Sequence, residues 1–201
     1  FPRDAAAWCN STGNQLISKE ATGGKSVVVI EKGEPKSCNI VTSCEGKGKT
    51  FIMFSDDLDK ALATLVLANG AAATGQKVTI FFTFWGLNVI KKLHKPNVEK
   101  DIFGKMFGMM LPSSSRKLKL SKMSMGGIGG KMMRYIMNRK GIDSLESLRQ
   151  QALENGVEFI ACQMSMDVMG VKQEELLDEV TIGGVATYME RADNANINLF
   201  I

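Results

Sequence analysis

The sequence KVTIFFTF at residues 77–84 decides the fold, because it is apolar on both faces of an extended chain. A run of β-branched and aromatic residues of this length is typical of a strand buried on both sides, as in parallel sheets covered by helices. A helical segment at 56–74 precedes it and carries Asp56 and Asp57 in its first turn, where carboxylates suit the helix dipole. A further strand predicted at 50–55 completes a strand–helix–strand unit of the parallel kind.

The same alternation of strands and helices continues to the end of the chain. It predicts an α/β fold over residues 50–201, with a parallel sheet of about five strands flanked by helices. The later elements that we predict are helices at 144–155, 172–179 and 185–192, and strands at 157–161, 180–182 and 197–200.

The first part of the chain has a different character. Residues 1–32 predict the end of a helix followed by strands at 15–20 and 26–32, which is too little to bury a core and indicates a small α+β remnant of a larger domain. Residues 33–49 are rich in Gly, Pro, Ser and Lys and predict a linker. Since the chain starts at Phe1 without an initiator methionine, we expect it to be a fragment of a longer protein.

A basic and methionine-rich insertion interrupts the α/β pattern at about residues 94–143. Residues 102–140 contain nine basic residues and no acid, and eight of the 13 methionines lie in the insertion. We expect one or two helices here, broken at 112–115 and 126–130. Flexible methionines suit an adaptable contact surface, although such a set more often forms core or a subunit interface. The lesser alternative is contact with a membrane surface.

The bulk properties limit the class of protein. A chain of 201 residues with 44% hydrophobic and 23% charged residues is typical of a folded globular protein. No apolar run is long enough to span a bilayer. Nothing in the sequence indicates secretion, so we expect a cytoplasmic protein with reduced cysteines. The net charge of +4 is unevenly distributed, which indicates a local basic surface on a protein that is not basic throughout. We predict no nucleic-acid partner.

Motifs for cofactors and metals fail on their spacing. Residues 126–131, GGIGGK, suggest a phosphate-binding loop, but Met132 stands where a dinucleotide fingerprint needs Gly and a P-loop needs Ser or Thr. Cys38 and Cys44, with His94 as the single histidine, do not make a zinc site. Cys38 and Cys44 are either linker residues or mobile resolving thiols that reach Cys162. We therefore predict no metal and no cofactor in this chain.

The candidate site lies where the predicted strands end. Ligands of open parallel sheets bind outside the carboxyl ends of the strands, and the helices that follow point their positive N-termini to the same edge. The residues in this position are Ser55, Asp56, Thr83, Trp85, Gly86, Cys162, Gln163, Gly183 and Gly184.

Cys162 is the candidate for chemistry, because it places a thiol at this edge. A helix N-terminus can lower the pKa of a cysteine from about 8.5 towards roughly 3.5–7.5, and the thiolate is the nucleophile in sulfur exchange. The alternative is a small buried hydrophobe, which is a common fate of free cysteine. From the pattern of residues alone, both interpretations stand.

Residues 50–201 resemble the DsrE/DsrF-like sulfur-relay proteins, in particular the larger DsrE-like subfamily. The matching stretches begin with FSDDLDKALATLVLANGAAATGQKVTIFFTFWGLN at 54–88 and continue at 120–137, 161–189 and 196–201. Residues 1–32, with DAAAWCNSTGNQLIS at 4–18, are similar to the second half of a TusA-like sulfur-carrier domain. The half that would carry the Cys-Pro-x-Pro site of such a domain is absent, and Cys9 is not its cysteine.

The resemblance implies a flavodoxin-like fold that assembles into homo-oligomers. It implies that Cys162 accepts sulfane sulfur as a persulfide and passes it to a thiol acceptor. The partners would then be sulfur donor and acceptor proteins or low-molecular-weight thiols. It also implies a parent chain of the CoA-disulfide-reductase type, and FAD and NAD(P)H would belong only to a reductase domain of that parent.

Two alternatives to sulfur transfer remain open at this point. One is a non-catalytic module for oligomerisation or docking within a multidomain disulfide reductase, in which Cys162 serves packing. The other is a nucleotide- or flavin-binding module, which rests on analogy of fold alone.

Overall fold

The described residues form two separate sheets, one in each of two parts of the chain. β1 (Gln15–Thr22) and β2 (Lys25–Glu31) form an antiparallel hairpin, and an α/β domain starts with β3 (Gly48–Met53) inside the predicted linker. The rest of that linker lies outside the described residues. The computed structural model describes residues 9, 14–22, 25–31, 48–94, 96, 98 and 102–201.

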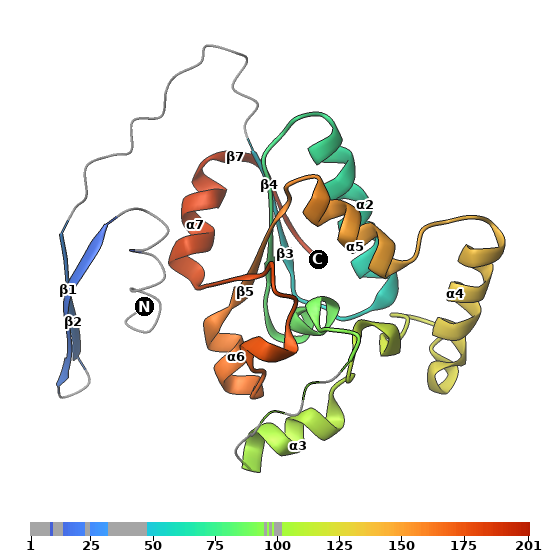
Figure 1. Cartoon of the computed structure of the whole chain (residues 1–201), viewed down its shortest axis with the longest axis horizontal. Helices are drawn as coiled ribbons and strands as arrows, with labels where there is room; N and C mark the ends of the chain where they lie inside the picture. The colour runs from blue at the N-terminus through green and yellow to red at the C-terminus, as the bar shows by residue number, and fades with distance from the viewer. Residues whose placement is uncertain are drawn as a thin grey trace.

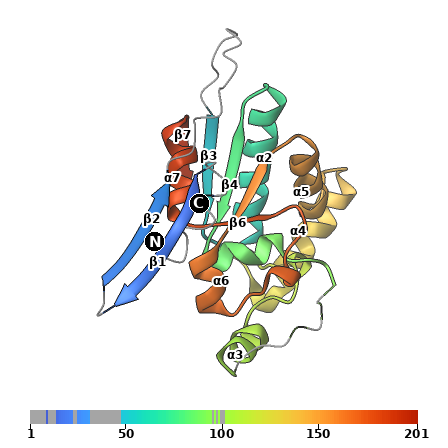
Figure 2. The ribbon, with the colours of Figure 1, turned by 60° about the vertical axis from the view of Figure 1, so that its left-hand side comes forward.

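A five-stranded sheet forms the centre of the α/β domain (Figures 1 and 2). Its order is β6-β5-β4-β3-β7, and every neighbouring pair is parallel, which confirms the predicted fold class. β4, which lies within the apolar stretch at 77–84, is central and buried along its whole length. The strands besides β3 are β4 (Val78–Phe82), β5 (Glu158–Cys162), β6 (Thr181–Gly183) and β7 (Ala195–Phe200).

Helices cover the two faces of the sheet unequally. α2 (Leu58–Ala73) and α5 (Leu145–Glu154) pack together on one face, where Ile80 and Phe82 of β4 belong to the main core. α7 (Val185–Asp193) lies on the other side (Figure 1). There Phe81 belongs to a second, smaller cluster. Alternate residues of one strand therefore serve two cores.

The described part of the insertion contains two α-helices. They are α3 (Ile102–Met110) and α4 (Ile128–Arg139), with 3₁₀ turns η2 (Ser115–Lys117) and η3 (Met125–Gly127) between them. The insertion is tied to the start of α2, because the backbone N–H of Leu58 donates to the carbonyl of Lys119 at 2.7 Å. Among the described residues, none of the helices has both the length and the apolar character that crossing a membrane requires.

The prediction of a helix at 172–179 is wrong, because only the 3₁₀ turn η4 (Gln173–Glu175) forms there. The Glu175 side chain turns back to accept the N–H of Lys172 at 2.9 Å. The backbone of the same stretch bonds to the 3₁₀ helix η1 (Phe84–Ile90) and the residues after it, with Leu177 N–H donating to Ile90 O at 3.1 Å. These tertiary bonds replace the helical ones. The sequence also did not predict η1 or the short α6 (Gln163–Met169).

Candidate functional site

The carboxyl ends of the five strands lie at one edge of the sheet, because all the strands run parallel. The residues predicted for the site therefore come to the same edge from four strands. Ser55 and Asp56 follow β3, Thr83, Trp85 and Gly86 follow β4, Cys162 and Gln163 span the end of β5, and Gly183 and Gly184 span the end of β6.

Cys162 joins the interior strand β5 to the helix that follows, as the last residue of the strand and the N-cap of α6. Its side chain belongs to the cluster formed with Phe81, Ile160 and Tyr188 on the α7 side of the sheet. The residue is 1% exposed, and its thiol makes no capping hydrogen bond. In this conformation Cys162 is therefore buried in a cluster of apolar and aromatic residues.

A buried pair of hydroxyl groups lies beside Cys162. Phe82 of β4 pairs with Ala161 of β5, so the next residues along the two strands, Thr83 and Cys162, are neighbours at the edge. The hydroxyl oxygens of Thr83 and Ser165 are 2.8 Å apart and form a hydrogen bond. Sequence reasoning found Thr83 from its place at a strand end. It missed Ser165, whose signal was its position one helical turn after Cys162.

A carboxyl group at the end of β3 is paired with a buried amide. Asn88 of η1 donates from Nδ2 to Asp56 Oδ2 at 2.9 Å. Burial raises the pKa of Asp56 above its ordinary value, and the neighbouring charge of Asp57 adds to this, while the hydrogen bond from Asn88 opposes it. Asn88 Oδ1 is buried and has no hydrogen-bond partner among the described residues. The signal for Asn88 was an amide within an otherwise apolar run.

Four aromatic rings form a group at the same edge, Phe54, Phe84, Trp85 and Phe200. The ring centroid of Phe54 lies 5.4 Å from those of Phe84 and Trp85 and 5.6 Å from that of Phe200, distances at which aromatic pairs attract. Trp85 is 46% exposed and Phe200 is 69% exposed. Phe84 has a φ of 47°, a strained value for a residue with a side chain. The edge therefore presents an aromatic surface, of which the sequence predicted only Trp85.

Three glycines were predicted for the pocket, all of them are buried, and two of them, Gly86 and Gly183, allow close packing. A Cβ on Gly86 would lie 1.9 Å from the carbonyl oxygen of Met53, so only glycine lets η1 approach β3. A Cβ on Gly183 would lie 3.0 Å from Ile160 Cγ2 and 3.2 Å from the Thr187 side chain.

Ser55 and Gln163 make local contacts at the starts of helices. Ser55 Oγ donates to Asp57 Oδ2 at 2.8 Å, and Gln163 Nε2 donates to Asp167 Oδ1 at 3.1 Å.

The remaining thiols do not converge on Cys162 in what the structure describes. Cys9 and Cys162 are both buried, and no disulfide joins them. Cys38 and Cys44, the candidate resolving thiols, lie outside the described residues. Over the described ranges there is no cluster of three or more His, Cys, Asp or Glu side chains that could hold a metal ion.

These observations define a class of protein: a parallel α/β domain with a cysteine at the carboxyl end of an interior strand. The model of the DsrE/DsrF/DrsH-like family matches residues 46–200. The chain belongs to this family.

Two curated relatives match almost their whole length. The uncharacterized protein YrkE of Bacillus subtilis (strain 168) is 44% identical over 155 residues, which is 77% of this chain and 97% of that protein. The sulfur carrier protein DsrE2 of Allochromatium vinosum is 38% identical over 161 residues, which is 78% of this chain and 99% of that protein.

The comparison with solved structures found several matching chains. The YchN protein from E. coli covers 77% of this chain and 99% of its own, with a TM-score of 0.46 and 12% identity. The match to the family model does not cover residues 1–45. The TusA-like interpretation of the N-terminal segment and the reductase-type parent chain therefore stay predictions.

Proposed function

We propose that this chain is a sulfur-relay protein that carries sulfane sulfur as a persulfide on Cys162. Membership of the DsrE/DsrF/DrsH-like family supports a role in sulfur relay, as does the 38% identity to a protein named a sulfur carrier. The position of Cys162 at the carboxyl end of β5 is the observation that carries the assignment to this residue. The partners are then sulfur donor and acceptor proteins or low-molecular-weight thiols in the cytoplasm.

The chemistry consists of two thiol exchanges. The Cys162 thiolate attacks the outer sulfur of a donor persulfide, R–S–SH, so that a new S–S bond forms on Cys162 and the donor leaves as the thiolate R–S⁻. An acceptor thiolate then attacks the outer sulfur on Cys162 and releases the Cys162 thiolate. No electrons are gained or lost overall. The first step requires that the donor persulfide reach the Cys162 thiolate, and the second that the acceptor thiolate reach the outer sulfur carried on Cys162.

The burial of Cys162 imposes a condition on this chemistry. The thiol is covered by Phe81, Ile160 and Tyr188, so a donor reaches it only when part of this cover moves. Tyr188 belongs to α7, on the face of the sheet that has the smaller core. Opening of α7 is therefore the movement that we expect to admit the donor.

Mass spectrometry of the protein after treatment with a polysulfide donor tests the proposal. We expect a gain of about one sulfur atom on the peptide that contains Cys162, and its loss when an acceptor thiol is added. Cys162→Ser should lose this uptake, whereas Cys9→Ser, which alters the other buried cysteine of the described residues, should retain it. An absence of sulfur on Cys162, or full uptake by Cys162→Ser, would rule out the proposal. Variants of Cys38 and Cys44 would then show whether either acts as a resolving thiol.

A non-catalytic module for oligomerisation or docking is the second candidate function. The burial of Cys162 among apolar groups is the observation that favours it. Apolar side chains exposed on α6 and α7, which are Met164, Val168, Val185 and Met189, give this candidate a contact surface. It predicts that Cys162 resists alkylation in the native protein even when a sulfur donor or acceptor is present. Sedimentation of the same protein would report the predicted homo-oligomer.

A further inference from the structure

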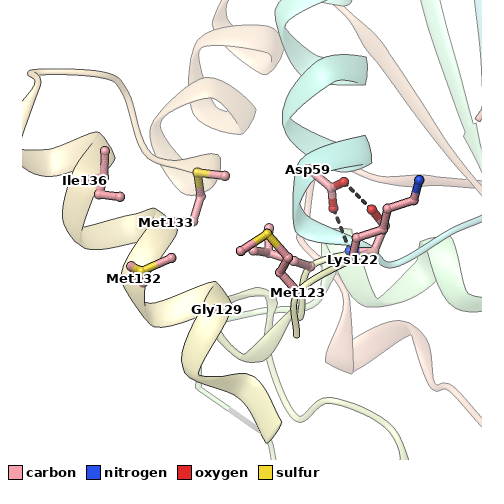
Figure 3. A pocket seen from close by; sticks show the side chains of 9 residues that line it. Asp59, Lys122, Met123, Gly129, Met132, Met133 and Ile136 are labelled. Carbon is pink, nitrogen blue, oxygen red and sulfur yellow. Dashed lines mark hydrogen bonds between the residues drawn. The ribbon is translucent and has the colours of Figure 1, made fainter. Parts of the chain in front are cut away.

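The insertion forms an apolar groove that the proposed sulfur transfer does not use. The groove has a volume of about 250 Å³ and lies between α4, the segment 120–123 and Asp59 of α2 (Figure 3). Three of the side chains that line it are thioethers, those of Met123, Met132 and Met133. In Figure 3, Met123 and Met132 extend toward each other across the groove, and Met133 lies next to Met132 on α4.

The backbone fixes Met123 against α4. A Cβ on Gly129 would lie 2.1 Å from the carbonyl oxygen of Met123, so the absence of a side chain at Gly129 allows this close approach. Met132 and Met133 follow Gly129 by three and four residues, which places them on the same face of the helix. Met123 itself has a φ of 57°, a strained conformation that the surrounding contacts must hold. Met123 is thus brought from a separate segment to the helical face that carries the other two thioethers.

The other groups of the groove do not suit a hard cation. Asp59 is its one carboxylate, and it already accepts hydrogen bonds from the backbone N–H of Ser121 at 2.9 Å and from the Ser121 hydroxyl. Lys122 adds a positive charge, and none of the lining residues is a histidine or a cysteine. Mg²⁺ and Ca²⁺ require several oxygen ligands, whereas thioethers select soft ions, of which Cu(I) is the biological example.

We propose that this groove is a Cu(I) site in which the thioether sulfurs of Met123, Met132 and Met133 are the ligands. The site is separate from Cys162 and does not depend on the proposed sulfur transfer. Three neutral donors hold a monovalent ion without the excess charge that a divalent ion would add beside Lys122. Thioethers do not titrate in the physiological range, so Cu(I) binding here releases no proton. Binding through thiolate or imidazole does release protons.

A titration of the whole chain, labelled with ¹³C at the methionine ε-methyl groups, tests the site. Cu(I) is added without oxygen as its acetonitrile complex, with bicinchoninate as a competing chelator. The cysteines also take up Cu(I), but the methyl signals report only on methionine. We expect the signals of Met123, Met132 and Met133 to shift together and to saturate at one ion, with the same midpoint at pH 6 and pH 8. Three unshifted signals at saturating Cu(I) would overturn the proposal.

Matched variants separate the groove from methionine in general. Met123→Leu conserves volume, so the fold should be retained. Loss of groups that only support the ligands weakens metal sites by about 10- to 100-fold. Loss of the Met123 thioether should therefore weaken Cu(I) binding, as reported by the signals of Met132 and Met133, by at least about tenfold. Met109→Leu alters a residue of α3 that is 87% exposed and outside the groove, and it should leave the midpoint unchanged. Equal midpoints for the two variants would exclude the site. Sulfur uptake on Cys162 should be unaffected by Met123→Leu.

Discussion

The hydroxyl oxygens of Thr83 and Ser165 lie 2.8 Å apart in a buried hydrogen bond that links the end of β4 to the first turn of α6. Thr83→Val keeps the shape of the side chain but leaves the buried hydroxyl of Ser165 without this partner. An unpaired buried polar group costs about 1–3 kcal/mol, so the free energy of unfolding should fall by about that amount in urea denaturation. Thr83→Ser keeps the hydroxyl and should cost less. Equal losses for the two variants would show that the hydrogen bond contributes little.

Gly86 and Gly70 should respond in opposite directions to alanine. A Cβ on Gly86 would meet the Met53 carbonyl oxygen at 1.9 Å, whereas one on Gly70, inside α2, would meet nothing within 4 Å. Overpacking costs about 1–3 kcal/mol or more, so Gly86→Ala should be destabilised by at least that much. Gly70→Ala should be stabilised by roughly 0.5–1 kcal/mol, because alanine loses less entropy in a helix. Thermal unfolding of the two variants measures both effects, and a stable Gly86→Ala would contradict the packing of η1 on β3.

The partly buried carboxyl of Asp56 should make the free energy of unfolding fall as the pH rises. Its pKa is raised above the ordinary value of 3.8 by burial. Between 3.8 and the higher pKa of the folded protein, the folded state therefore binds more protons than the unfolded state. Below both pKa values the carboxyl is protonated in each state and the effect disappears. Urea denaturation from pH 3 to pH 7 should show this decrease in the free energy of unfolding of the wild type relative to Asp56→Asn.

Asp56→Asn removes the titration and still offers an oxygen to Asn88 Nδ2. It should be more stable than the wild type at pH 7, and its advantage should shrink on acidification and vanish below about pH 3.8. An advantage that grew towards acid pH would mean that the Asp56 pKa is lowered in the folded protein.

The sheet was predictable because its strands are defined by local patterns. Residues 77–84 are apolar on both faces, and Ser144 and Gly156 mark the two ends of the helix before β5. The placement of Cys162 at the carboxyl edge followed from the end of that strand. The failed helix at 172–179 has helical composition, but its backbone bonds to residues at 90–92, which local patterns do not reveal.

The surroundings of the candidate site depend on contacts between distant parts of the chain. Cys162 is buried in a cluster that includes Tyr188 of α7, and the aromatic group at the edge is completed by Phe200 of β7. Neither contact has a signal in the residues around position 162. The same holds for Gly129, whose role appears only when the Met123 backbone lies against α4.

Tyr188 should control access to Cys162. Its ring lies 5.2 Å from that of Phe81, both belong to the cluster around Cys162, and Tyr188 is 7% exposed. Truncation of a buried aromatic side chain costs about 3–5 kcal/mol of stability. If the free energy of local opening falls by only about 1.4 kcal/mol of this, the open population rises tenfold. Tyr188→Ala should therefore raise the rate of Cys162 alkylation by at least about tenfold.

Tyr188→Phe is the matched control for this change. It keeps the ring, loses only the contact of 3.2 Å between the Tyr188 and Thr50 hydroxyls, and should stay near the wild-type rate. The rates are measured with iodoacetamide by peptide mass spectrometry, under conditions where circular dichroism shows that both variants are folded. If Cys162 carries sulfur, uptake from polysulfide should accelerate in parallel with alkylation, because both need the same opening. Faster alkylation without faster sulfur uptake would favour a packing role for Cys162, and an unchanged alkylation rate would show that Tyr188 does not cover the thiol.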